Sequence, residues 1–242
     1  MIVNNIENIN QKSFTSKRRI IREADNMARR INCQYPRVSC SNIAKFKNIK
    51  DHEDLYNRLA EQISDMRKLI SSDMKKSKFY LSEIKVLPKY VSERKLGNCD
   101  ESAKLALIAA KVNNINDGKL GLLYSLDSEK YLDHVVLCVQ NDGNPYIIDP
   151  WLGFADFLPN AMQRYKTEYN YHFDLNGDPK EQLILDTYVS YFGIVVDKVS
   201  PKKLKANFKE LILPKPYKKS FVSKIYDKFK TQYLGIKNKF NL

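Results

Sequence analysis

The sequence predicts an α+β fold in which a central helix packs on an antiparallel sheet. Three observations lead to this class. Residues 1–76 carry helical patterns of apolar residues, residues 99–112 are apolar on most helical sides, and short strand-like runs lie between residues 120 and 149. A helix that is apolar on most sides must be covered on most sides. Short strands joined by tight turns are typical of antiparallel sheets.

Two helices are expected in the N-terminal region. Ser13 or Ser16 can cap a basic helix that runs to about residue 32, with an apolar face at Ile20, Ile21, Ala24 and Met27. Asp51 can cap a second helix, whose apolar residues recur at helical spacing at Leu55, Leu59, Ile63, Met66 and Ile70. Residues 33–50 are predicted to form the loop between them.

The middle of the chain leads into the predicted central helix. Residues 77–96 are expected to form a short strand or helix, then Pro88, then a polar loop. Gly97 marks a turn, after which residues 99–112 form the apolar helix. Asn113-Asn114 and Asp117-Gly118 have the composition that ends a helix.

Strands are expected in the second half of the chain. Three lie at residues 120–125, 134–140 and 146–149, and the polar segment 141–144 has the composition of a hairpin turn. A late strand is predicted at residues 188–196 (YVSYFGIVV) in the same sheet. Residues 152–187 are predicted to be rich in loops.

Length and composition narrow the class of protein. With 242 residues and 43% hydrophobic residues, the chain can bury a sizeable core. It has no run of about 18 apolar residues, so no membrane-spanning helix is expected. The polar N-terminal segment lacks the apolar stretch of a Sec signal peptide, so none is expected.

The four cysteines fit a reducing compartment. They are Cys33, Cys40, Cys99 and Cys138. A chain of this size does not need disulfides, although Cys33 and Cys40 can pair. Cys138 alternates within a strand-like run and is expected to be buried. No CxxC spacing occurs and only three histidines are present, so a structural zinc site is not expected.

Positive charge is concentrated near the C-terminus. The net charge is +13, and residues 200–242 hold twelve lysines against two acids, Glu210 and Asp227. Apolar residues recur every four positions among these lysines, which predicts a basic amphipathic helix, at Phe221, Ile225, Phe229 and Tyr233. The segment is either a solvated surface or a docking surface for an acidic protein or a membrane. No nucleic-acid-binding motif is present, so no nucleic-acid partner is expected.

Cys99 is the candidate nucleophile. It stands in the segment GNCDES at the predicted start of the central helix. The unpaired N–H groups and the dipole of a helix N-terminus favour a thiolate there. The Cys99 backbone N–H is also a candidate oxyanion donor. The second donor is predicted to be either the Asn98 side chain or an upstream amide such as that of Gln62.

His134 and Asp149 are the candidate partners of the thiol. His134 begins one predicted strand and Asp149 ends the next, so a hairpin brings the two side chains within hydrogen-bond reach. Asp149 would then orient the imidazole and stabilise its protonated form. His172 is an alternative base. Trp151, the only tryptophan, either packs in the core or shields the His–Asp pair from water.

In order and setting, Cys99, His134 and Asp149 resemble the catalytic residues of the papain-like and transglutaminase-like cysteine enzymes. The likeness is greatest to small secreted bacterial effectors such as the glutamine deamidase effector of Shigella, and it covers roughly residues 95–153. It implies residues 1–76 as a helical region of the same domain, 77–199 as a papain-like catalytic core and 200–242 as the basic extension.

The resemblance implies attack by Cys99 on a glutamine or peptide amide of a target protein, through a thioester and without a cofactor. Deamidation, proteolysis and transglutamination all remain open. It also implies a bacterial protein delivered into a host cell. Arylamine N-acetyltransferases have the same triad order, but Pro150 and Trp151 follow Asp149 here, and the nucleophile lacks that family's paired glycines. A non-enzymatic adaptor built on residues 200–242 is a further alternative.

Overall fold

The computed structural model describes residues 3–39, 52–125, 134–141, 143–168 and 183–214. By its contacts the chain divides into two compact units, Met1–Ile212 and Leu213–Leu242. All helices and strands reported below lie in the first unit. The second unit falls almost entirely outside the described residues.

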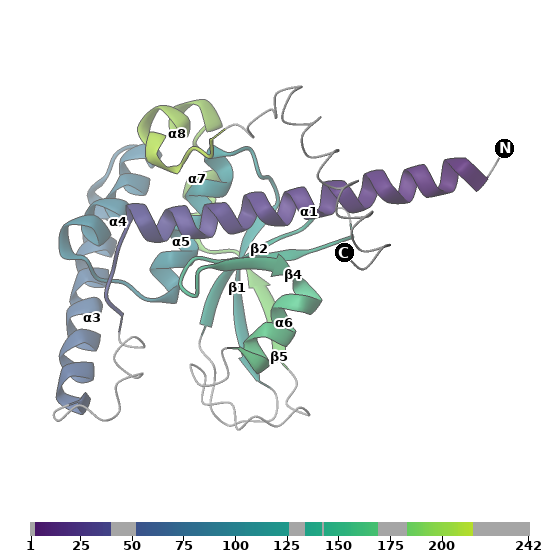
Figure 1. Ribbon diagram of the computed structural model, residues 1–242. Coiled ribbons are helices and arrows are strands. Elements are labelled where there is room, and N and C mark those ends of the chain that lie inside the picture. The colour runs from purple at the N-terminus through teal and green to yellow at the C-terminus, as the bar shows by residue number, and fades with distance from the viewer. Residues whose placement is uncertain (1–2, 40–51, 126–133, 142, 169–182, 215–242) are drawn as a thin grey trace, which may run out of the picture. The chain divides into compact units, whose positions relative to one another are not determined.

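Five strands form one antiparallel sheet (Figure 1). They are β1 (Gly118–Ser125), β2 (His134–Val139), β3 (Tyr146–Asp149), β4 (Phe154–Phe157) and β5 (Leu183–Tyr188), in the spatial order β4-β3-β2-β1-β5. β2 is the central strand, and all six of its residues are buried. A strand covered on both faces must lie in the middle of a layered core. The first residue of β2 is His134, so the packing of the core holds the candidate base in position.

The helix α5 (Cys99–Val112) covers β2. Its apolar residues are buried around nearly the whole helix, and they include Leu105, Ala106, Ile108 and Ala109. Besides the sheet, α5 contacts helices from both ends of the chain. The predicted α+β class, with a buried helix on an antiparallel sheet, is confirmed.

In the described residues, three helices precede α5: α1 (Val3–Gln34), α3 (His52–Lys76) and α4 (Tyr80–Arg94). The apolar face predicted for α3 packs inward, and its buried members are Leu59, Ile63, Met66, Ile70 and Met74. In α1 the residues buried at helical spacing are Ala24, Met27, Ala28 and Ile31. The start predicted at Ser13 or Ser16 was wrong, because the helix begins about ten residues earlier.

The expectation of a break at Pro88 was also wrong. A single helix, α4, runs through this proline. Proline removes one backbone hydrogen bond from a helix interior. Here Pro88 lies on the buried face of α4 with Ile84, Leu87 and Val91. The burial of this apolar face outweighs the missing bond. α4 ends at Lys95, which has a left-handed backbone conformation.

The C-terminal part of the first unit contains more helix than predicted. Of residues 152–187, most of those that the structure describes lie in β4, α6 (Leu158–Thr167) and β5, so the prediction that they are rich in loops was wrong for the described part. α6 begins with a proline in its first turn and buries Ala161 and Tyr165, which are four residues apart. Proline suits a helix start because its missing N–H would have no intrahelical partner there.

The strand predicted at 188–196 was wrong. β5 ends at Tyr188, and α7 (Tyr191–Asp197) follows. The Ser190 side chain caps α7 by accepting a hydrogen bond from the Gly193 N–H at 3.0 Å. The buried residues Phe192, Val195 and Val196 have helical spacing. Here a serine cap and tertiary burial override the strand preference of β-branched residues.

Two short elements follow, α8 (Pro201–Asn207) and a 3-10 helix (Lys209–Leu211). α8 contacts α5, so these residues, which the sequence placed in the basic extension, pack within the first unit. The predicted amphipathic helix around 221–233 lies outside the described residues. Among the helices that are described, none is both long and apolar enough to cross a membrane.

Candidate active site

Cys99 is the first residue of α5 and is partly exposed. Asn98 is the N-cap, and its carbonyl accepts the Ser102 N–H at 3.1 Å and the Ser102 hydroxyl at 2.7 Å. The first N–H groups of a helix have no intrahelical carbonyl to bind. The Cys99 sulfur therefore lies at the end of a helix where backbone dipoles favour a negative charge. The predicted placement of Cys99 is confirmed.

The loop before Cys99 is held by the segment after α1. Val38 and Leu96 form a parallel bridge, with hydrogen bonds from Val38 N–H to the Lys95 carbonyl at 2.8 Å and from Gly97 N–H to the Val38 carbonyl at 3.2 Å. Arg37 adds a second link, because its Nε and Nη2 donate to the Ser102 hydroxyl at 3.0 and 2.7 Å. Cys99 is thus held by bonds to the residues before it and after it in the chain.

Gly97 is required at this turn by space as well as by backbone angle. Its φ is +157°. A Cβ added there would lie 3.1 Å from Arg37 Cδ and 3.2 Å from Glu101 Cβ. The absent side chain lets residue 37 approach the first turn of α5.

Glu101 links the first turn of α5 to α3. Its carboxylate accepts the Asn98 backbone N–H at 2.8 Å, as part of a capping box. It also accepts Arg67 Nε and Nη2 at 2.7 and 3.1 Å. The side chain of Glu101 is 2% exposed and that of Arg67 is 44% exposed. Burial alone would raise the pKa of Glu101, but the bonds from Arg67 and the Asn98 N–H lower it.

Replacing Arg67 with alanine is expected to lower the free energy of unfolding by about 2–3 kcal/mol, because a buried carboxylate loses its cation. A carboxyl group whose pKa is lowered by folding stabilises the protein at neutral pH and loses that effect in acid. The difference in unfolding free energy between the wild type and R67A should therefore shrink as the pH falls below about 4.5. Urea unfolding of R67A at neutral and acidic pH measures both effects.

The control for R67A is K68A. Lys68 forms an ion pair with Asp65 on the exposed face of α3, and such pairs contribute at most about 1 kcal/mol. Equal unfolding free energies for R67A and K68A would show that the Arg67–Glu101 pair does not hold α5 in place.

His134 and Asp149 form the predicted pair. Continuing the β2–β3 register by one residue sets Asp149 opposite Val136, so His134 is its diagonal neighbour on the same face. His134 Nε2 lies 2.6 Å from Asp149 Oδ2. Both residues are only 1% exposed. The distance predicted from the hairpin is therefore confirmed.

Tyr165 is a member of the site that the sequence did not reveal. Its hydroxyl donates to Asp149 Oδ2 at 3.0 Å, and its ring lies edge-on to His134 with centroids 5.8 Å apart. The Leu152 backbone N–H donates to Asp149 Oδ1 at 3.1 Å. Three donors thus fix this carboxylate. Tyr165 is buried on α6, and the sequence analysis missed its role because it did not predict this helix.

Charge is favoured on the His134 ring. Burial lowers the pKa of the ring, but the Asp149 carboxylate, by its charge and hydrogen bond, and the Cys99 sulfur, by the same two effects, raise it to about 10. Since Nε2 faces Asp149, Nδ1 is the nitrogen that faces Cys99. The two neighbours, a carboxylate on one side and the sulfur on the other, thus favour the protonated form of His134.

Trp151 lies against the imidazole. The two ring centroids are 5.0 Å apart at an interplanar angle of 48°, and Trp151 Nε1 donates to the Ser39 hydroxyl at 3.4 Å. Trp151 is half-buried, so its ring separates His134 from solvent. Of the two predicted roles, this contact favours shielding of the His–Asp pair.

The remaining candidates lie elsewhere. Asn98 caps α5, and Gln62 is exposed on α3, so the choice of second oxyanion donor stays a prediction. His172 and Cys40 lie outside the described residues. Cys33 is an exposed thiol without a disulfide. Cys138 is buried as predicted, and burial raises its pKa. In the described part of the chain, no three histidine, cysteine or acidic side chains gather as a metal site would require.

A comparison with protein families matches the part of the chain that holds Cys99, His134 and Asp149. A model described as Dot/Icm T4SS effector Ceg10 matches residues 56–199, which is more than half of the chain. The chain belongs to this family. The match contains Cys99, His134 and Asp149, together with Arg67 and Tyr165. No curated protein and no solved structure matches the chain.

Membership of the Ceg10 family defines the biological setting. Dot/Icm effectors are bacterial proteins that a type IV secretion system translocates into host cells. The prediction of a bacterial virulence effector delivered to a host is therefore confirmed. The family description names no activity, so the chemistry has to be argued from the site.

Proposed function

We propose that this effector is a cysteine-dependent acyl-transfer enzyme with a papain-like or transglutaminase-like core, and that it deamidates glutamine in a host protein. The observation that carries the proposal is the Cys99–His134–Asp149 arrangement. A sulfur at a helix start hydrogen-bonds a buried imidazole, whose other nitrogen lies 2.6 Å from a fixed carboxylate. Thiol nucleophiles are activated by such a partner.

In the first half-reaction the Cys99 thiolate attacks the carbonyl carbon of a glutamine side chain. A C–S bond forms and the carbonyl oxygen becomes an oxyanion, which the N–H groups at the start of α5 can stabilise. The C–N bond then breaks, and the His134 imidazolium gives its proton to the departing nitrogen. Ammonia leaves and a thioester remains on Cys99.

In the second half-reaction His134, now neutral, takes a proton from water as the water oxygen attacks the thioester carbon. The C–S bond breaks with the sulfur leaving as a thiolate, the carboxylic acid product leaves and gives its proton to solvent, and the thiolate–imidazolium pair is restored. Asp149 stabilises the protonated ring at both ends of the cycle. The same steps on a peptide bond give proteolysis, and an amine in place of water gives transglutamination.

Alkylation tests the activated thiol. At about pH 7 iodoacetamide is expected to label Cys99 at least about tenfold faster than the exposed thiol of Cys33, because an ordinary thiol is only a few per cent ionised there. Intact mass and peptide mapping give the two rates. Equal rates at Cys99 and Cys33 would contradict the proposal.

A lysate incubated in ¹⁸O-labelled water identifies the reaction. Deamidation converts glutamine to glutamate with one ¹⁸O, a gain of about 3 Da, because water resolves the thioester. Proteolysis places ¹⁸O at a new C-terminus, and transglutamination joins two peptides without ¹⁸O. We expect labelled glutamate at one or a few host sites. Labelled new C-termini instead would make the protein a protease.

The basic residues near the C-terminus favour a second candidate, an adaptor that binds anionic surfaces. Twelve lysines against two acids in residues 200–242 provide the charge. Binding of the full chain to phosphatidylserine vesicles that survives C99A but is lost when the eight lysines beyond Ile212 become glutamine would support it. Absence of both ¹⁸O-labelled products and cross-linked peptides in the lysate would then leave the adaptor as the better description.

A further inference from the structure

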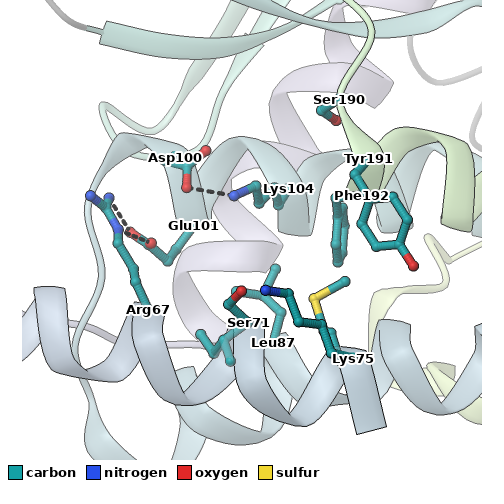
Figure 2. Close-up of a pocket in the computed structure, with 12 residues that line it drawn as sticks. Arg67, Ser71, Lys75, Leu87, Asp100, Glu101, Lys104, Ser190, Tyr191 and Phe192 are labelled. Atoms are coloured by element: carbon teal, nitrogen blue, oxygen red, sulfur yellow. Dashed lines mark hydrogen bonds and ion pairs between the residues drawn. The ribbon is translucent and has the colours of Figure 1, made fainter. Parts of the chain in front are cut away.

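A hollow of about 330 Å³ lies beside the first turn of α5 (Figure 2). α3, α4, α5 and the start of α7 contribute to its wall. Its inner surface is apolar and comes from buried side chains, namely Ile70, Met74, Leu87 and Phe192. An apolar hollow of this size accepts one large side chain of a ligand.

The hollow and the nucleophile share a wall. Asp100 and Glu101, the two residues that follow Cys99, line it. Arg67 also lines it and pairs with Glu101. The residues that follow Cys99 in the chain thus form part of the wall of the hollow.

The charges at the hollow are unequal. Figure 2 shows both acids engaged, Glu101 by Arg67 and Asp100 by Lys104 at 2.6 Å. Lys75, the remaining charged residue of the wall, is exposed and forms no ion pair with another described residue. The rim thus has one uncompensated positive charge, which attracts a carboxylate.

Exposed apolar surface continues from the mouth. Tyr191 lines the hollow with 62% of its surface exposed, and Val189 nearby in sequence is 76% exposed. The Tyr191 hydroxyl donates to Glu83 at 2.8 Å, which holds the ring in place. Apolar surface of this kind around a hollow is typical of a binding site for protein.

We propose that this hollow is the specificity pocket of the enzyme: it receives an aromatic or large aliphatic side chain of the target protein, next to an acidic residue that pairs with Lys75. This inference rests on the proposed function, since it places the pocket beside the attacked amide. It defines the target segment as one with a glutamine, an apolar residue and an acidic residue close together.

Electrophilic peptides test the pocket. In each peptide the glutamine is replaced by 6-diazo-5-oxonorleucine, which alkylates an active thiolate, and phenylalanine is scanned through three positions on either side within an aspartate-containing sequence. The best phenylalanine peptide is expected to label Cys99 at least about tenfold faster than its alanine counterpart, as burial of an aromatic side chain implies. Exchanging aspartate for lysine should slow it about threefold.

Two exposed positions provide the variants. S71W fills the hollow and should abolish the preference for phenylalanine, whereas K75E should abolish the preference for aspartate. K85E is the matched control, because Lys85 is exposed on α4 and does not line the hollow. It should behave as wild type. K75E keeps the test valid if S71W does not fold.

Iodoacetamide separates the two ways in which the inference can fail, since this small reagent does not need the pocket. Selective alkylation of Cys99 together with equal rates for the phenylalanine and alanine peptides would overturn the pocket alone. Unselective alkylation would overturn the proposed enzyme and the pocket with it.

Discussion

Replacing Cys99 with alanine is expected to lower the ¹⁸O-labelled product by at least about 10⁴-fold, because the thioester cannot form without the nucleophile. The fold should persist. Cys99 is partly exposed at the end of a helix that is fixed by Asn98, Glu101 and Arg37, so the unfolding free energy should change by less than about 1 kcal/mol. Product yield and thermal unfolding together measure this.

C33A is the matched control for C99A. Cys33 is an exposed thiol near the end of α1, and it takes no part in the site. Product formation by C33A should equal that of the wild type. Full activity in C99A, or equal loss in both variants, would show that the chemistry does not pass through Cys99.

Replacing Asp149 with asparagine is expected to lower turnover by about 10³–10⁴-fold, because the imidazole loses the group that orients it and stabilises its charge. Asp149 is the strongest influence that raises the pKa of His134, so this pKa should fall in D149N. At about pH 7, iodoacetamide should label Cys99 more slowly in D149N than in the wild type, because the imidazolium that favours the thiolate is less populated.

The pH dependence of stability should also depend on the His134–Asp149 pair. A histidine whose pKa is raised by folding stabilises the protein fully below its ordinary value of 6.5 and loses that effect as the pH rises through about 10. The difference in Tm between wild type and D149N should therefore shrink at alkaline pH. D186N is the control, since Asp186 is exposed on β5 and its carboxylate accepts a hydrogen bond from the Tyr124 hydroxyl at 2.7 Å, away from the site. A pH profile of D149N like that of D186N would refute the role of Asp149.

The candidate site could be predicted largely from local sequence. Cys99 follows an N-cap asparagine and a glycine turn, and His134 and Asp149 flank a short hairpin. In each case the prediction used only contacts between residues close in sequence, up to the separation of 15 between His134 and Asp149. Hairpin register and helix capping are set by such near neighbours.

The errors occurred where distant residues decide the local structure. α4 continues through Pro88 because its apolar face is buried, and residues 191–197 are helical because Phe192, Val195 and Val196 pack inward. Neither fact can be read from the segment alone. The intrinsic secondary-structure propensity of a segment contributes less free energy than the burial that tertiary packing provides.

The sequence alone determined the α+β class and the order of thiol, imidazole and carboxylate, because periodicity and turn chemistry act over short distances. Only the tertiary structure decided that Tyr165 holds Asp149, that Arg67 neutralises Glu101 and that a hollow opens beside the first turn of α5. These contacts join residues on separate elements, and the packing of those elements depends on the whole core at once.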